Sequence, residues 1–338
     1  MNKWFLLGII LLTWFAAPTS AQQRPQYTQY LLNQYLLNPA LSGIENYTDV
    51  KLGYRQQWSG FEDAPKTSFA TIHWALGDEY LWQNPLSMGD DGKDPRSRSY
   101  LQDYSASPSH HGVGASIVSD KAGQLNMTII NLSYAYHMQI GQRLNLAVGA
   151  AAGASLTAID VNKLMMENPA DPALANARKT VTNPDLSIGL WLYGRDFFAG
   201  FSAQQLIPAK LNFSGEELYN TGRLVPHYFL TSGYRLPLGE NIDIIPSAML
   251  KYAANTPLSA DLNMKITFDR RIWLGAGYRQ GDALSVMAGI NVSHLINVTY
   301  SYDSTTSGIN RVSNGSHEIV LGLLLNNVYK VVCPQRSW

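Results

Sequence analysis

The feature that most limits what this chain can fold into is a strict alternation of apolar residues with polar or small ones. In residues 260–268, which read ADLNMKITF, every second side chain is apolar and the intervening ones are Asp261, Asn263, Lys265 and Thr267. Residues 282–292 and 295–302 alternate in the same way. Because successive side chains of a strand point to opposite faces, these segments predict strands with one apolar face and one polar or small face.

The length of these runs separates two kinds of β-protein. Several extend over about nine to twelve residues, the length that a tilted strand needs to cross a bilayer, whereas strands of soluble proteins average about five or six. A soluble two-sheet sandwich is the alternative, but it would use shorter strands. Beyond residue 21 no run reaches about 18 consecutive apolar residues, which excludes a helical membrane protein. We therefore predict an all-β fold, a transmembrane antiparallel β-barrel.

The spacing of the runs predicts about 14 strands, an even number that returns both chain ends to the same side of the membrane. We expect these strands near residues 48–58, 65–76, 111–119, 125–138, 142–157, 184–193, 196–204, 226–237, 241–251, 257–268, 271–280, 282–293, 295–303 and 315–327. If the first strand runs outward, tight links such as GE and DR face the periplasm and most long links face outward, as is usual. Residues 77–109 break this rule, so either a strand is miscounted or this insert faces the periplasm.

The N-terminus indicates export. Lys3 precedes an apolar run from Trp4 to Ala17, and small residues follow up to Ala21, the pattern of a signal peptide over residues 1–21. Residues 22–47 then form a separate segment, in which Tyr27, Leu31, Gln34 and Tyr35 are spaced for a short helical turn that Pro39 would end. We expect this segment to plug or brace a barrel formed by residues 48–338, with a disordered leader as the plainer alternative.

Composition excludes several functions. The net charge is +0, which argues against nucleic acid as a partner, and the single cysteine excludes an internal disulfide framework. None of the 7 histidines has the spacing of a zinc site or a hydrolase motif. The pair His110 and His111 fits an interfacial or solvated position, and the small residues of 149–155 fit a strand that thins the barrel wall or its inner face. We predict no enzymatic activity, no cofactor and no metal site.

The end of the first strand carries polar groups of unusual size. By period two, Arg55 and Gln57 share a face with Gly53 and belong inside the barrel. There they would join a hydrogen-bond network that ties the N-terminal segment to the wall, or contact a secreted protein directly. Trp58 falls on the other face and fits an aromatic girdle at the bilayer boundary.

The N-terminal block carries a distinctive order of motifs. It covers about 50 residues, from a Gln/Tyr-rich start through Asn-Pro-Ala and an Arg-Gln-Trp strand to a Pro-Thr-Ser step. Its positions are Tyr27, Gln29, Tyr30, Asn38, Pro39, Ala40, Gly43, Tyr54, Arg55, Gln57, Trp58, Gly60, Pro65, Thr67 and Ser68. This block resembles the PorP/SprF family of outer-membrane proteins from the Bacteroidetes.

The resemblance implies a function that no pattern in the residues shows. It implies a barrel in the cell outer membrane that serves the type IX secretion system. Its partners would be the lipid bilayer, periplasmic and outer-membrane components of that system, and a secreted surface protein such as a gliding adhesin. An outer-membrane channel or uptake porin for small solutes is the alternative function, and a soluble adhesin is the third.

Overall fold

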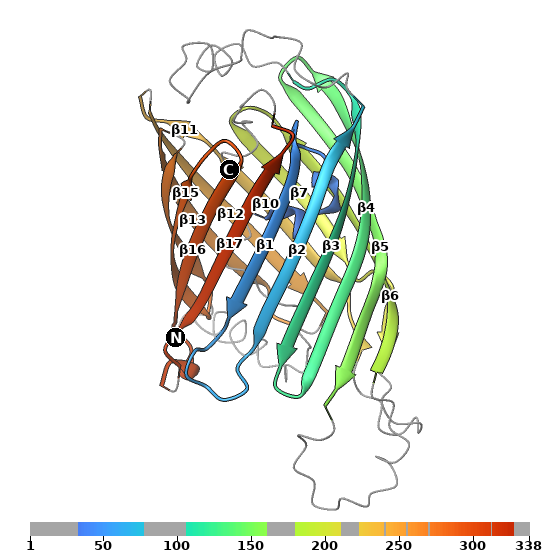
Figure 1. The fold of residues 1–338 in the computed structure, drawn as a ribbon, viewed down its shortest axis with the longest axis vertical. Helices are drawn as coiled ribbons and strands as arrows, with labels where there is room; N and C mark the ends of the chain where they lie inside the picture. Colours follow the sequence, from blue (N-terminus) through green and yellow to red (C-terminus); the bar gives the residue numbers. More distant parts are fainter. Residues whose placement is uncertain are drawn as a thin grey trace, which may run out of the picture.

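The fold is a closed antiparallel β-barrel (Figure 1). The computed structural model describes residues 33–77, 106–160, 180–210, 223–239, 241–254, 256–269, 271–311 and 313–327. Within these residues 14 strands close the barrel, because the first strand pairs with the last as well as with the second. No helix among the described residues has the length and apolar character needed to cross a bilayer. The predicted strand number and barrel architecture are confirmed, and the soluble sandwich is excluded.

The wall strands follow one another in chain order around the barrel. Their bounds are β1 (Thr48–Gln56), β2 (Lys66–Leu76), β3 (His110–Ala122), β4 (Leu125–Gly141), β5 (Leu144–Ile159), β6 (Thr180–Tyr193), β7 (Phe197–Gln204), β10 (His227–Tyr234), β12 (Ile242–Ala253), β13 (Ser259–Phe268), β14 (Ile272–Arg279), β15 (Ala283–Asn291), β16 (Ile296–Thr305) and β17 (Ser316–Leu325). Short two-residue strands add small pairings: β8 (Ala209–Lys210) with β9 (Arg223–Leu224), and β11 (Leu236–Pro237) with β12.

The predicted faces of the strands are confirmed by burial. On β13, Leu262, Met264 and Phe268 are exposed on the outside, whereas Asp261 and Lys265 are buried inside the barrel. The same division holds on β15 and β16, where the exposed side chains include Leu284, Val286, Ile290 and Tyr300. Aromatic rings also stack across the outside of neighbouring strands, as Phe201, Tyr228 and Tyr252 do on β7, β10 and β12. A continuous apolar outer surface of this kind is what a bilayer requires.

The two ends of the barrel differ in their connections. We call the end where β1 begins and β17 ends the entry end, and the opposite one the loop end. At the entry end the chain turns within two residues between Gly141 and Leu144, and within three between Phe268 and Ile272. At the loop end β5 and β6 are separated by residues 160–179, and β16 and β17 by residues 306–315. The insert joins β2 to β3 at the entry end, so no strand is miscounted; its residues 78–105 lie outside the described residues.

Candidate functional site

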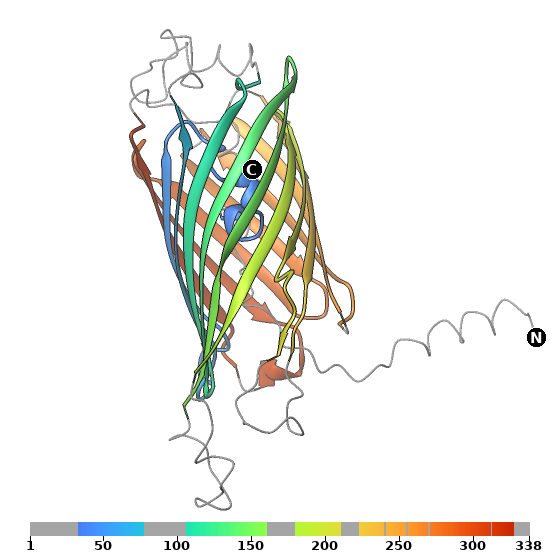
Figure 2. The same ribbon diagram turned by 90° about the vertical axis from the view of Figure 1, so that its right-hand side faces the viewer.

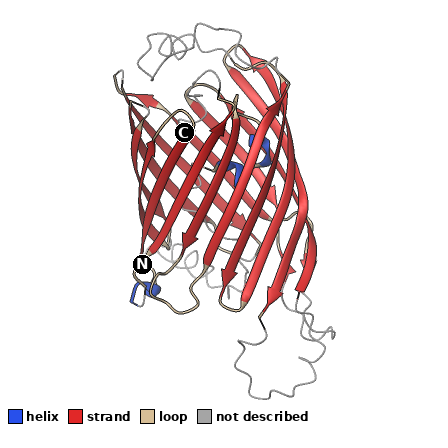
Figure 3. Cartoon of the chain, in the orientation of Figure 1, coloured by secondary structure: helices blue, strands red, loops and turns tan. Residues whose placement is uncertain are grey.

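The chain enters the barrel before it forms the wall. We call residues 33–47 the inner segment; it lies inside the barrel (Figure 2, Figure 3). It contains two single turns of 3-10 helix, Gln34–Leu36 and Pro39–Leu41. The predicted helical turn is not confirmed, because Gln34 and Tyr35 lie in a 3-10 turn while Tyr27 and Leu31 lie outside the described residues. The signal peptide also lies outside them.

Asn38 anchors the middle of the inner segment to one side of the wall. Its side-chain oxygen accepts the backbone N–H of Ala40 at 3.0 Å, which caps the second turn. Its side-chain nitrogen donates to the carbonyl oxygens of Leu190 on β6 and Phe201 on β7, at 3.0 and 3.2 Å. One amide therefore fixes the local turn and its position against two strands.

Two polar side chains of β7 bind the backbone of the inner segment beside Asn38. Ser202 Oγ donates to the carbonyl oxygen of Leu37 at 2.6 Å. Gln204 Nε2 lies 2.9 Å from the carbonyl oxygens of both Leu36 and Leu37. These carbonyl groups are therefore satisfied by the wall, although they lie in a segment that forms no sheet.

Three histidines bind the other side of the inner segment. His137 Nε2 donates to the carbonyl oxygen of Ser42 at 2.8 Å, and His110 Nε2 lies 3.1 Å from that of Gly43. The two imidazole rings stack with centroids 4.5 Å apart. On β2, His73 Nδ1 accepts the backbone N–H of Gly43 at 3.2 Å. Ser42 and Gly43 are thus held from β2, β3 and β4.

Tyr35 adds a contact to β4. Its hydroxyl lies 2.7 Å from Ser133 Oγ, which in turn lies 2.8 Å from Ser42 Oγ. Burial raises the pKa of Tyr35 to about 12, so the phenol keeps its proton at physiological pH. The hydrogen bond between Tyr35 and the wall therefore persists over the whole physiological range.

Small residues of the wall leave room for the inner segment. A Cβ added to Gly112 on β3 would lie 1.9 Å from the carbonyl oxygen of Ser42, and one added to Gly189 on β6 would lie 1.9 Å from Asn38 Oδ1. On β5, a Cβ at Gly149 would lie 2.5 Å from the backbone of Ala40. The small residues predicted to thin the inner face thus include one that directly accommodates the inner segment.

The same contacts explain the Asn-Pro-Ala-Leu-Ser-Gly stretch of the sequence. Pro39 begins the turn that Asn38 caps, and Ala40 is 0% exposed beneath β5. Gly43 has a φ of 72°, and a Cβ there would lie 2.7 Å from Gly112 Cα. The wall surrounds these positions closely. They therefore hold small residues, or residues such as proline and glycine whose backbone conformations fit the turn.

Apolar packing fills the barrel beside these hydrogen bonds. Leu37, Leu41 and Ile44 of the inner segment belong to one buried cluster with side chains that point inward from the wall, namely Ala147, Trp191, Tyr193, Phe198, Phe229, Ile245 and Met249. The inner faces of the strands were predicted to be polar or small, whereas this part of the interior is a packed apolar core around the inner segment.

Arg55 points into the barrel, as predicted. It is 1% exposed, and its guanidinium lies 2.8 Å from Asp303 on β16 and 3.1 Å from Glu318 on β17. Arg279 on β14 also approaches Asp303, at 3.9 Å, and pairs with Asp261 on β13, which pairs with Lys251 on β12. These six charged side chains form a network between wall strands, which we call the charge belt. That this network also ties the N-terminal segment to the wall stays a prediction.

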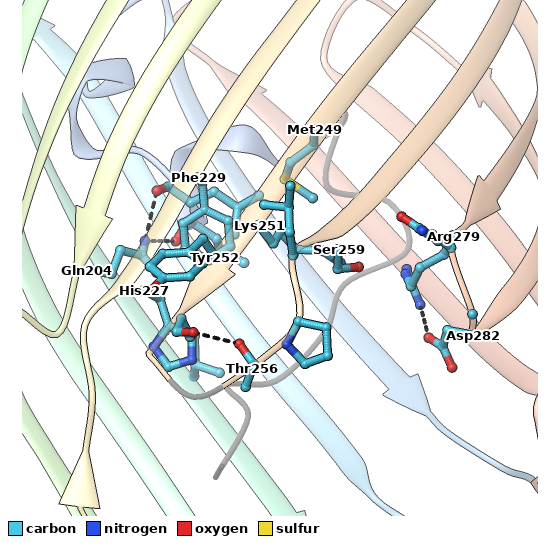
Figure 4. A pocket seen from close by; sticks show the side chains of 18 of the residues that line it. Gln204, His227, Phe229, Met249, Lys251, Tyr252, Thr256, Ser259, Arg279 and Asp282 are labelled. Atoms are coloured by element: carbon cyan, nitrogen blue, oxygen red, sulfur yellow. Dashed lines mark hydrogen bonds and ion pairs between the residues drawn. The ribbon is translucent and has the colours of Figure 1, made fainter. Parts of the chain in front are cut away.

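A pocket of about 550 Å³ lies between this charge belt and the inner segment (Figure 4). Leu36 and Leu37 of the inner segment line it together with Phe229 and Met249. Lys251, Arg279 and Asp282 provide charged groups, and Arg279 Nη1 pairs with Asp282 at 3.0 Å. The pocket therefore has one apolar part and one charged part.

The remaining positions of the N-terminal block are dispersed. Tyr54 is exposed on the outside of β1, Thr67 donates to Asp120 at 2.6 Å inside, and Ser68 is exposed on β2. Gln57, Trp58, Gly60 and Pro65 lie in the link after β1, where the Gln57 N–H donates to the Pro65 carbonyl at 2.9 Å. Trp58 is a turn residue with a φ of 48°, so period two does not place it on the outer face. Tyr27, Gln29 and Tyr30 lie outside the described residues.

The sequence gives little indication of the histidines that hold the inner segment. His111 does face outward, against Tyr134 and Tyr136, but the interfacial position predicted for His110 is wrong because that residue is buried against Gly43. Period two places His73, Ser133 and His137 on inner faces. It cannot distinguish them from inner residues that contact only the wall, because the path of the inner segment is not encoded in the strands.

A comparison with models of protein families identifies the family to which this barrel belongs. A model described as "Type IX secretion system membrane protein PorP/SprF" matches residues 19–323. The chain belongs to the PorP/SprF family. Membership extends the resemblance seen in the N-terminal block to nearly the whole barrel, and it makes the chain an outer-membrane barrel of the type IX secretion system. No protein of curated function matches the sequence.

Several solved structures are similar to this PorP/SprF member at low sequence identity. The toluene transporter TbuX of Ralstonia pickettii matches with a TM-score of 0.51 and 8% identity, over 87% of this chain and 94% of that one. A FadL homologue of Pseudomonas aeruginosa has a TM-score of 0.45 and 10% identity, over 90% and 95%. Omp33 of Acinetobacter baumannii has a TM-score of 0.46 and 8% identity, over 84% and 100%. The likeness to TbuX shows a common fold.

Proposed function

We propose that this barrel is a non-enzymatic component of type IX secretion that binds proteins on both sides of the outer membrane. Its entry end faces the periplasm and binds secretion machinery, while its loop end supports the secretion or surface attachment of a cargo protein such as a gliding adhesin. Family membership supports a role in type IX secretion. The directions of the strands support the assignment of the entry end to the periplasm and of the loop end to the cell surface.

The observation that carries this proposal is the filled interior. The inner segment is bonded to strands from β2 to β7 and packs into an apolar core with inward side chains of β5, β6, β7, β10 and β12. A solute channel needs a continuous aqueous path, and a packed core does not provide one. A barrel filled in this way serves better as a scaffold for protein partners.

The alternative is a channel or uptake porin for small solutes, and the 550 Å³ pocket supports it. The pocket combines an apolar part with charged groups, as sites for small molecules do. Swelling of liposomes that contain the purified barrel separates the two functions. The scaffold proposal expects liposomes impermeable to small sugars and amino acids, whereas rapid swelling would favour the channel.

The insert 77–109 joins two wall strands at the entry end, and we propose that it forms the docking surface for periplasmic machinery. The hypothesis that residues 22–45 share this surface does not extend to residues 33–45, because these are almost all buried inside the barrel. Deleting residues 80–105 should abolish co-purification of periplasmic secretion proteins from native membranes. The barrel itself should still insert, since the deletion leaves every wall strand intact.

A matched deletion at the loop end, of residues 162–177 between β5 and β6, serves as the control. It should leave the periplasmic partners bound and affect only the attachment of cargo at the surface. Unchanged recovery of periplasmic proteins after the 80–105 deletion, with a folded barrel on a heat-modifiability gel, would refute the proposed docking surface.

A further inference from the structure

The inner segment starts inside the barrel, not at one of its ends. Asn33 is 4% exposed, and its Nδ2 donates to Thr71 Oγ1, halfway along β2, at 3.3 Å. The residues that precede Asn33 therefore have to leave the lumen through one of its two ends. We propose that residues 24–32 run from Asn33 through the 550 Å³ pocket, so that the chain start left by removal of the predicted signal peptide emerges at the loop end.

The position of the pocket gives the direction of this path (Figure 4). Leu36 and Leu37 form the inner limit of the pocket. Residues 256–258 and 280–282, from two links at the loop end, form its outer limit. Toward the entry end, the inner segment packs with wall side chains into the apolar core. A chain that left Asn33 in that direction would have to pass beside this core, whereas the pocket offers it room.

Polar groups next to Asn33 also call for partners. Gln34 is 8% exposed, and neither its Nε2 nor its Oε1 forms a hydrogen bond within the described part of the chain. The same holds for Asn33 Oδ1. Buried amides without partners are unfavourable. Thr28 and Gln29, a few positions earlier in the sequence, carry the hydroxyl and amide groups that can satisfy them.

The composition of residues 24–32, which read RPQYTQYLL, matches both parts of the pocket. The two tyrosines and two leucines of the segment provide apolar surface for the part lined by Phe229 and Met249. The charge belt contains equal numbers of cations and carboxylates, and Asp282 adds one more carboxylate. The guanidinium of Arg24 would balance this charge and pair with Asp282 at the loop end.

The length of the chain before Asn33 is sufficient for this path. Residues 22–32, if extended, span at most about 36–40 Å. On β7, only about 10 Å of strand separates Phe201, whose carbonyl binds Asn38, from the strand end at Gln204. The chain start can therefore pass the pocket and emerge beyond it. The proposed function places the loop end at the cell surface, and the surface location of the chain start rests on that orientation. Residues 24–32 then take no part in periplasmic docking.

The first test maps the path by photocrosslinking in the full-length barrel in detergent. Tyr30 is replaced by the photoreactive residue benzoylphenylalanine, and crosslinked peptides are identified by mass spectrometry. We expect crosslinks to β10 or β12, which line the pocket. The same replacement at Phe61, which is 52% exposed in the link after β1, is the control and should give none to these strands. Crosslinks from position 30 only to entry-end links, or none at all, would overturn the proposal.

The second test locates the chain start in intact cells with a membrane-impermeant maleimide. Each variant carries Cys333→Ser and one new cysteine, and its barrel is first checked for heat-modifiable migration. Asn310→Cys marks the loop end and Gln142→Cys the entry end, since both residues are exposed in links at those ends. We expect Gln23→Cys to be labelled as fully as Asn310→Cys, and Gln142→Cys only after the outer membrane is permeabilised.

The two reference cysteines separate failure of the path from failure of the proposed orientation. If only Gln142→Cys is labelled in intact cells, the barrel is inserted the other way round. The path still holds in that case when Gln23→Cys becomes labelled together with Asn310→Cys on permeabilisation. Labelling of Gln23→Cys that follows Gln142→Cys, or no labelling under either condition, would overturn the proposed path.

Discussion

Replacing Arg55 by methionine is expected to lower the free energy of unfolding by about 3 to 5 kcal/mol. The guanidinium lies between Asp303 and Glu318, and all three side chains are almost fully buried. Methionine fills a similar volume but removes the positive charge between Asp303 and Glu318, while Arg279 stays 3.9 Å from Asp303. Removing the central charge of a buried cluster costs much more than losing a surface pair. Urea unfolding of the barrel refolded in lipid vesicles measures the difference.

Arg195→Met is the matched control for this substitution. Arg195 pairs with Asp196 in the link between β6 and β7, where the two side chains are 32% and 22% exposed. Such a partly solvated pair contributes about 1 kcal/mol or less. Equal destabilisation by the two substitutions would show that the charge belt does not stabilise the barrel in the way its burial indicates.

Replacing Gly112 by alanine is expected to displace the inner segment. The new Cβ would lie 1.9 Å from the carbonyl oxygen of Ser42, which also accepts the hydrogen bond of His137. Either the segment moves or the wall distorts, at a cost of about 1 to 3 kcal/mol. We expect lower stability in urea together with new ion conductance across a planar bilayer.

Gly141→Ala provides the comparison, because a Cβ there meets nothing nearer than 3.7 Å. That variant should match the unmodified barrel in both stability and conductance. A Gly112→Ala barrel that is destabilised yet remains non-conducting would mean that the segment stays in place and the wall yields. No change in either measurement would contradict the close approach of Ser42 to β3.

The strands could be predicted because their environment imposes a simple pattern. Lipid outside and protein or polar groups inside require alternation at every residue, and β13 shows it from Ala260 to Phe268. Some observed strands end elsewhere than predicted because pairing continues past the apolar band. For example, β4 extends to Gly141, although the alternation predicted an end near residue 138.

The interior could be predicted only in part. Burial of Arg55 follows from period two, but its partners Asp303 and Glu318 lie about 250 residues away in the chain and become neighbours only when β17 closes on β1. The apolar core was missed because Trp191 and Phe198 read as ordinary strand residues.

The seam between β1 and β17 has a consequence for how the molecule is made. A wall of paired strands has no gap, so a chain segment bonded within it has to be there before the ring is completed. The inner segment is followed directly by β1 and bonds to strands as far along the chain as β7. We therefore expect the first half of the sheet to form around the inner segment during folding. The pairing of β1 with β17 would then form last.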